Sequence, residues 1–244
     1  MNIQLAEKDK EIERILGNIP AELDLAVNLP SRNKFYNLKD PNKPITVRAM
    51  KFEDERVFAD TSRKGADSLN ILLDRCVDNI DIDDLLIFDK LILLIKIREA
   101  TYGTDYEFDL TCTSCHAEER VGFDLNDLLV KEVPSDLSDP RVVTLPVIKK
   151  DVKIKLPRVC HEEYLLNAPQ KHLWRFIEEI DGCSDRGVIA EVVKKLPLRD
   201  IHCVIGKLNG DEFGIEPKMN YRCPQCGHEE EVVLPITSDF FYMS

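Results

Sequence analysis

The sequence predicts an α+β protein built from two diverged repeats, each composed of a strand, two helices and a hairpin. Two C-x2-C pairs lie at similar places in two period-two strand patterns: Cys112 with Cys115, and Cys223 with Cys226. The residues that precede the first pair match residues that precede the second at a constant offset of 107. In both halves, helical apolar patterns separate an early strand from the hairpin that carries the cysteines.

The composition is that of an acidic protein large enough to bury its own core. The chain has 244 residues, 43% of them hydrophobic, with 33 Lys and Arg against 45 Asp and Glu and a net charge of -12. Because nucleic-acid phosphates require clustered cations, this charge disfavours a nucleic-acid-binding function.

No targeting or membrane-spanning segment is apparent. The first 20 residues lack the pattern of a signal peptide, and the longest apolar run, residues 85–97, is too short and too charged to cross a bilayer. We therefore expect a soluble protein of a reducing compartment, whose eight cysteines serve metal binding and buried thiols rather than disulfides.

We divide the chain at two points. Residues 1–27 are expected to form an N-terminal helical arm, residues 28–130 the first repeat with its hairpin, and residues 131–244 the second repeat with its hairpin and an aromatic C-terminal tail. Each repeat opens with a Leu-Pro pair, at 29–30 and at 145–146. Chance similarity of short patterns is the alternative to duplication, but the shared order of four features favours duplication.

A strand and a helix start follow each Leu-Pro pair. Residues 45–48 and 152–155 form the strand patterns, and residues 52–55 and 159–162 follow at the offset of 107. Acidic residues in these second segments favour the positive end of a helix dipole. Each repeat is therefore expected to pass from a strand into a helix.

The second helix of each repeat differs between the copies. The first copy predicts a helix from about residue 82 to residue 99 that is apolar on most sides, and such a helix should be buried at the centre of the fold. Its counterpart, residues 198–208, is shorter and more polar. We expect the second copy to be more exposed.

The cysteine pairs predict one structural zinc ion, held by Cys112, Cys115, Cys223 and Cys226. A two-residue gap lets both sulfurs of a tight turn face one tetrahedral metal, and two turns complete a four-thiolate shell. Neither pair precedes a helical pattern, which disfavours a redox C-x-x-C. Because a closed shell leaves no open position, we expect the ion to be a structural staple that joins the two repeats in one shared zinc ribbon. The neighbouring residues His116 and His228 stay open as replacement ligands.

No catalytic motif is found, and we expect a protein without enzymatic activity. The sequence has no Gly-rich phosphate loop, nucleophile elbow or dinucleotide fingerprint. His161-Glu162 begins like a zincin motif, but Leu165 stands where the second His is required. The acidic residues within 81–84 fit a helix start better than a cation site. A hydrolase with an unrecognised acidic site is the enzymatic alternative.

Two aromatic segments are candidate partner-binding sites. Residues 29–36 form a basic and aromatic loop before the first predicted strand, and residues 239–244 close the sequence with three aromatics. Large rigid rings bury much area in an interface at little entropic cost. The candidate partner-binding residues are Arg32, Phe35, Tyr36, Phe240, Phe241 and Tyr242. For the tail, packing on its own domain is an equally open alternative.

Several short motifs occur in a distinctive order. They are the Leu-Pro-Ser-Arg loop ending at Phe35-Tyr36, the strand and helix start at 45–55, the stretch from Arg98 to Gly103, the two cysteine pairs and Phe240-Phe241. From about residue 28 onward, this order resembles the baseplate protein family of T-even-type contractile-tailed bacteriophages. Asn33 stands where Gly is expected, and Asn tolerates a left-handed turn nearly as well.

The resemblance implies a non-enzymatic structural component of the phage tail baseplate, located in the virion and assembled in the host cytoplasm. It would act in several copies by docking on other baseplate or hub proteins, with zinc fixing the orientation of its repeats, and it would bind neither nucleic acid nor membrane. Two alternatives stay open: a chaperone of baseplate hub assembly and, from a different class, a zinc-ribbon nucleic-acid-binding factor.

Overall fold

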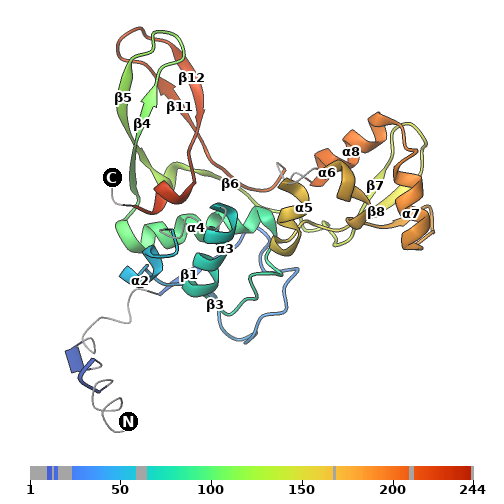
Figure 1. Ribbon diagram of the computed structural model, residues 1–244, viewed down its shortest axis with the longest axis horizontal. Helices are drawn as coiled ribbons and strands as arrows, with labels where there is room; N and C mark the ends of the chain where they lie inside the picture. The colour runs from blue at the N-terminus through green and yellow to red at the C-terminus, as the bar shows by residue number, and fades with distance from the viewer. Residues whose placement is uncertain are drawn as a thin grey trace.

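The computed structural model of the protein describes residues 10–12, 14–15, 24–58, 65–166, 169–208 and 212–242. The fold is α+β, as predicted. Figure 1 shows a first lobe, a long arm of two hairpins that projects from it, and a second lobe to one side. None of the helices within these ranges is long and apolar enough to cross a membrane.

The predicted N-terminal arm falls partly outside the described residues. Of residues 1–23, only 10–12 and 14–15 are described, and they are helical. Residues 25–27, at the end of the predicted arm, form a strand of the first lobe.

The first lobe contains a three-stranded antiparallel sheet in the order β1-β2-β3. Its elements are β1 (Leu25–Val27), β2 (Ile45–Val47), α2 (Phe52–Glu55), α3 (Gly65–Cys76), β3 (Val77–Asp78) and α4 (Ile87–Tyr102). The sequence analysis predicted only the middle strand. The outer two have three and two residues, too few to show a period-two pattern.

Helix α4 runs through the centre of this lobe and is buried on most sides, as its sequence predicts. It begins at Ile87 rather than near residue 82, because the backbone before it is held by a distant segment. The N–H of Ile87 donates to the carbonyl of Pro157, and the N–H of Val159 donates to that of Leu85. The helix ends at Gly103, whose φ of 89° favours glycine.

The arm consists of two antiparallel hairpins. Within each hairpin the two strands are equally long, with seven residues in the first hairpin and five in the second. The first pairs β4 (Asp105–Thr111) with β5 (Glu118–Asp124), and the second pairs β11 (Lys218–Arg222) with β12 (Glu229–Val233). Leu110, Val121 and Val232 pack with Tyr221 and two of the cysteines. Figure 1 shows the hairpins side by side, with their turns together at the tip.

A second pair of strands joins the two lobes. After the short turn η2 (Leu125–Asp127), strand β6 (Leu129–Lys131) leads toward the second lobe, and β10 (Gly214–Glu216) returns from it. The two strands pair antiparallel, and β10 packs on α4. Gly214 has a φ of 90°, and a Cβ atom there would lie 2.6 Å from the carbonyl oxygen of Phe88. Only glycine fits this close approach.

The second lobe also contains a three-stranded antiparallel sheet, in the order β7-β8-β9. Its elements are β7 (Arg141–Thr144), β8 (Asp151–Ile154), η3 (Val159–His161), α5 (Glu162–Leu166), α6 (Pro169–His172), η4 (Leu173–Arg175), β9 (Ile177–Ile180), α7 (Arg186–Val193) and α8 (Leu198–Leu208). Helix α8 has the bounds that the sequence predicted. It buries one face, including Ile201, Val204 and Leu208.

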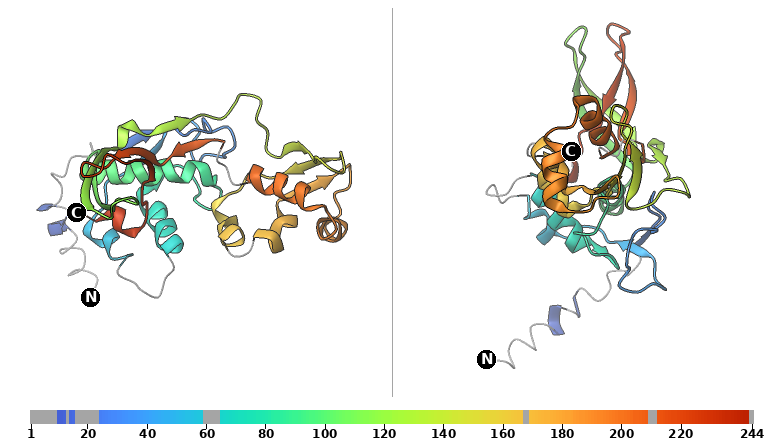
Figure 2. Two further views of the ribbon diagram at one scale, coloured as in Figure 1. Left: turned by 90° about the horizontal axis from the view of Figure 1, so that it is seen from above. Right: turned by 90° about the vertical axis from the view of Figure 1, so that its right-hand side faces the viewer.

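Each lobe has its own hydrophobic core. The first core gathers residues of the first sheet, α3 and α4 together with Phe240 and Phe241 of η5 (Ser238–Phe241). The second core is formed around Phe176 and Ile189 by the sheet and helices of residues 141–208. A smaller cluster lies where the lobes meet and is described below. The left view of Figure 2 shows the second lobe extending away from the first.

Candidate metal centre

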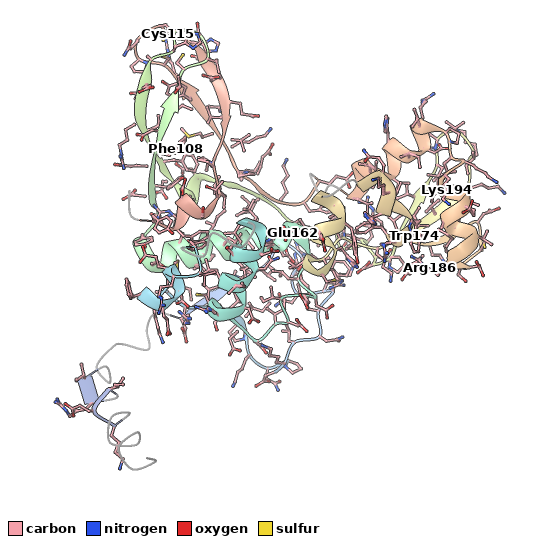
Figure 3. The ribbon with its side chains drawn as sticks, in the orientation of Figure 1. Phe108, Cys115, Glu162, Trp174, Arg186 and Lys194 are labelled. Carbon is pink, nitrogen blue, oxygen red and sulfur yellow. The ribbon has the colours of Figure 1, made fainter. Side chains whose placement is uncertain are left out.

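Four cysteines meet at the tip of the hairpin arm. The sulfur atoms of Cys112, Cys115, Cys223 and Cys226 all lie within 4.8 Å of one another. Cys112 and Cys223 are buried, whereas Cys115 and Cys226 are exposed. Figure 3 labels Cys115 at the turn farthest from the lobes. The four residues that the sequence analysis proposed as zinc ligands are therefore brought together.

The distances between the sulfur atoms fit a tetrahedral metal site. The Sγ atoms of Cys112 and Cys226 are 3.8 Å apart, and those of Cys115 and Cys223 are 3.7 Å apart. A zinc–sulfur bond of about 2.3 Å implies sulfur–sulfur separations of about 3.8 Å in a tetrahedron. A disulfide would require about 2.05 Å. The donor set of four thiolates is also one that zinc prefers.

Both turns adopt the same backbone conformation. The N–H of His116 donates to the carbonyl of Cys112, and the N–H of Gly227 donates to that of Cys223, at 3.0 and 2.8 Å. His116 and Gly227 both have a left-handed φ, of 60° and 72°. Glycine adopts this conformation without strain, while His116 does so at a steric cost. The turn aims both sulfurs of a pair toward the same point.

The thiols influence one another's ionisation. Hydrogen bonds from the backbone N–H groups of Cys226 and Gln225 outweigh burial and lower the pKa of Cys223 to about 6. At Cys115, the N–H of Ala117 favours the thiolate, but the neighbouring sulfurs, that of Cys226 first, outweigh it and raise the pKa to about 12. Four thiolates at this separation require a cation to share their charge.

Polar contacts between the hairpins support the site. The hydroxyl of Thr113 donates to a carboxylate oxygen of Glu230 at 2.8 Å, and the hydroxyl of Tyr221 donates to Glu119 at 2.9 Å. Each bond joins the first hairpin to the second. These contacts fix the two cysteine pairs relative to each other.

The two neighbouring histidines are not part of the cluster. Within the described residues, the four cysteines form the one group of His, Cys, Asp and Glu side chains close enough to share an ion, and it includes neither His116 nor His228. The ring nitrogen Nε2 of His228 lies 3.3 Å from the hydroxyl of Thr113. The geometry therefore favours the all-cysteine donor set over a replacement by either histidine.

Comparison with known families agrees with the resemblance seen in the sequence. The model of a family described as T4 bacteriophage base plate protein matches residues 27–242. The chain belongs to this family. No curated protein and no solved structure matches the chain.

The proposed partner-binding loop of this baseplate protein contacts its own chain. Arg32 is exposed and forms an ion pair with Glu132. Phe35 is half-buried in the small cluster between the lobes. The hydroxyl of Tyr36 donates to Asp89 at 2.5 Å and accepts from the N–H of Leu86 at 3.0 Å.

The aromatic tail of the baseplate protein packs on the first lobe. Phe240 and Phe241 are fully buried, and Tyr242 is half-buried. The ring of Phe241 stacks on Phe58 with centroids 5.5 Å apart. Intrachain packing is thus the arrangement that the structure contains. A partner contact by Phe240 or Phe241 would require their withdrawal from this core.

Sequence reasoning missed two buried carboxylates of the baseplate protein. Asp89 and Asp200 are fully buried, each at the third position of its helix, where they bond to the loop that follows a Leu-Pro pair. For Asp89 an available signal was a carboxylate in the first turn of an otherwise apolar helix. The sequence analysis used the charges of residues 85–97 only to exclude a membrane span.

Proposed function

We propose that the protein is a non-enzymatic structural component of a phage tail baseplate that docks on other baseplate or hub proteins. The observation that carries this proposal is the family match, because it covers residues 27–242 and so includes both lobes and the arm. Membership in a baseplate family supports association with other tail proteins in the virion. It supports a structural role rather than a catalytic one.

In this proposal zinc is a structural staple at the tip of the arm. A four-thiolate shell has no open position for a reacting molecule. Residues 115 and 223, which the ion would join, are separated by more than a hundred residues that include the whole second lobe. Closing a loop of that length stabilises the fold by a few kcal/mol, as an order-of-magnitude chain-entropy estimate. The ion would also fix the direction of the arm.

We also propose that the two halves arose by duplication, and the helix starts support this. The N–H of Lys51 donates to the carboxylate of Asp54 at 2.8 Å, and the N–H of Arg158 donates to Nδ1 of His161 at 3.3 Å. These pairs are separated by the offset of 107 found in the sequence. The same bond from the N-cap N–H to the side chain three residues later, one half of a capping box, therefore occurs at matched positions with different side chains.

The two buried carboxylates form a second matched pair. Asp89 of α4 accepts from the N–H of Ser31 at 3.1 Å, and Asp200 of α8 accepts from the N–H of Val147 at 2.7 Å. Ser31 and Val147 are each the residue after a Leu-Pro pair. Each lobe thus anchors its opening loop on the first turn of its second helix.

Backbone conformations agree as well. Asn79 and Asp181 directly follow the third strand of their sheets and have a left-handed φ, of 71° and 49°. Such positions are uncommon for residues other than glycine. Their recurrence at equivalent places supports one ancestral unit more strongly than a shared order of helices and strands does.

Quantitative mass spectrometry of purified phage particles tests the proposed function. We expect the chain to be present at a fixed ratio to other baseplate proteins. If it occurs in assembly intermediates but not in mature particles, the hub assembly chaperone is the correct alternative. Salt-dependent binding to random duplex DNA at physiological ionic strength would instead favour the nucleic-acid-binding factor.

A further inference from the structure

Two equivalent surfaces of the lobes differ in what covers them. The first corner is the loop of residues 29–34 together with the first turn of α4. The second corner is the loop of residues 145–150 together with the first turn of α8. In each, the buried carboxylate described above holds the loop on the helix. The inference below rests on the duplication and the docking role proposed above.

The first corner is occupied by residues 132–137 of the same chain, which continue from β6 and end in a turn, where the N–H of Leu137 donates to the carbonyl of Pro134. The N–H of Val133 donates to the carbonyl of Pro30 at 3.1 Å. Glu132 forms an ion pair with Arg32, and the ammonium of Lys34 donates to two carbonyls of the same segment. The polar part of this contact therefore has two components. One is a backbone hydrogen bond, and the other is the pairing of two cations of the loop with a carboxylate and two carbonyls of the segment.

The apolar part of the same contact forms the small cluster between the lobes. Val133 and Leu137 of the segment are buried there against Leu86 and Phe88, which flank the start of α4. The occupant of the first corner thus has a simple chemical pattern: a carboxylate, Glu132, followed directly by an aliphatic side chain, Val133, and then by a turn that brings in a second one, Leu137. Burial of two aliphatic side chains supplies most of the stabilisation expected from such a contact.

The second corner shares one left-handed residue with the first but has no such cover; Arg32 of the first corner is also left-handed, with a φ of 54°, and its counterpart Ile148 is not. Lys149 has a left-handed φ of 56°, as Asn33 of the first corner does with 59°. Among the described residues, no backbone N–H donates to the carbonyl of Pro146, the equivalent of Pro30. Val147 and Leu198 remain 44% and 73% exposed.

Three cations occur close to these aliphatic side chains along the chain: Lys149 in the loop, and Lys195 and Arg199 on either side of Leu198. Lys149, Lys195 and Arg199 are exposed, and within the described residues none of them has a carboxylate in ion-pair range. Asp200 is buried and committed to two backbone N–H groups of the loop. Residues 141–208 contain 13 Lys and Arg against 9 Asp and Glu, whereas acidic residues predominate in the whole chain. The second corner is therefore complementary to an acidic partner.

We infer that the second corner docks an acidic and aliphatic segment of another baseplate protein. It would take the place that residues 132–137 have on the first corner but use different cations, because Ile148 stands in the place of Arg32 and Lys150, in the place of Lys34, pairs with Asp181. The carboxylate of the docked segment would face Lys149, Lys195 and Arg199, and its aliphatic side chain would cover Val147 and Leu198. A second copy of this chain is a poor source, because its own residues 132–137 are committed to its first corner.

Site-specific photocrosslinking in the full chain during phage assembly tests this inference. A photoreactive benzoylphenylalanine replaces Leu198, and the control carries it at Val142, which is 57% exposed on β7 of the same lobe. We expect an adduct with a different protein from position 198 only. Mass spectrometry should map the adduct to a peptide with Asp or Glu next to Val, Leu or Ile.

A charge-reversed variant provides the specificity test. Lys195→Glu with Arg199→Glu should reduce the adduct at position 198 at least tenfold, while the melting temperature stays unchanged because both side chains are exposed. An adduct with a second copy of the chain, an adduct insensitive to the charge reversal, or none above the level of the Val142 control would each overturn the inference. A chain present in particles but without the adduct would leave the proposed function standing.

Discussion

The central helices of the two lobes, α4 and α8, occupy equivalent places but are buried to different extents. Helix α4 is covered by its own sheet, by β10, by residues 132–137 and by the C-terminal segment. Helix α8 packs on its sheet through one face and leaves Leu198 and Arg199 exposed. If the lobes arose by duplication, as proposed above, the difference shows how a duplicated unit can specialise. The first lobe is covered by other parts of the chain, while the second keeps a surface exposed, at which we propose that a partner docks.

The largest expected effect concerns the arm, which both halves of the chain share. Cys226→Ser should abolish binding of the predicted single zinc ion and lower the free energy of unfolding by about 3 kcal/mol or more, because metal binding at such a site contributes directly to folding. Isolated two-stranded hairpins are marginally stable, so the arm is expected to unfold first. Elemental analysis and urea denaturation measure the two effects.

Cys160→Ser is a matched control, because Cys160 is exposed and lies outside the cluster. It should retain one zinc per chain and wild-type stability. A metal content near zero in untagged wild-type protein purified without chelator would refute the zinc site. An unchanged unfolding midpoint of Cys226→Ser would refute its structural role.

The next largest effect is a difference in the stability cost of removing a side chain from the first lobe and from the second. Phe240→Ala removes a fully buried ring of the first core and should cost about 3–5 kcal/mol of stability. Leu198→Ala in the second lobe should change stability by less than about 0.5 kcal/mol. Thermal and urea unfolding of the two variants test this contrast. Equal costs would show that the exposed end of α8 is covered within the chain itself.

A smaller effect distinguishes the two buried carboxylates. Asp200 accepts from two backbone N–H groups, so Asp200→Asn places an amide against a donor and should cost about 1–3 kcal/mol. Burial raises the pKa of Asp89, which disfavours its charged form. Asp89→Asn removes that penalty and should cost less. Urea midpoints for the two variants decide the order, and a larger cost at Asp89 would contradict it.

The smallest expected effect is a difference in acid sensitivity between the two matched helix caps, which are formed by Asp54 in the first lobe and by His161 in the second. Burial, together with Lys155 and Arg158, lowers the pKa of His161. The folded protein then binds fewer protons here than the unfolded chain, so stability falls as the pH falls from about 6.5 toward the lowered value. At the matched position in the first lobe, burial would raise the pKa of Asp54, but hydrogen bonds from Arg48 and the N–H of Lys51 outweigh it and lower the pKa.

The cap formed by Asp54 therefore loses its contribution only below about pH 3.9, as the pH falls toward its lowered pKa. Urea unfolding of the wild type and of His161→Gln between pH 7.5 and 5 measures the difference. The wild type should lose stability more steeply than the variant. Parallel profiles would show that His161 does not carry the acid sensitivity of the second lobe.

The sequence was most informative where chemistry is local. The spacing of the cysteine pairs predicted the cluster, and the apolar pattern of residues 198–208 predicted α8 with its bounds. Helix α4 was expected five residues too early, because Ile82 and Leu85 are buried but lie in a turn held by residues 157–159. The pattern of apolar residues reports burial, and it does not separate a helix from a buried turn.

Long-range contacts were beyond prediction from one sequence. Strands β6 and β10 have three residues each and pair across more than eighty residues of chain. Whether the aromatic tail packs on its own lobe or stays exposed depends on the space that the first core leaves for Phe240 and Phe241, which no local pattern reveals. For the same reason the sequence could not show that residues 132–137 cover one corner and leave its equivalent open.

The pairing of β6 with β10 has a mechanical consequence for a protein of a contractile tail. The chain leaves for the second lobe at Lys131 and returns at Gly214, and these two residues face each other in the pair. A pull on the second lobe is thus shared by two backbones that run side by side, one of which is packed on α4. A force applied by a docked partner would pass through this double strand into α4, a helix that is buried on most sides.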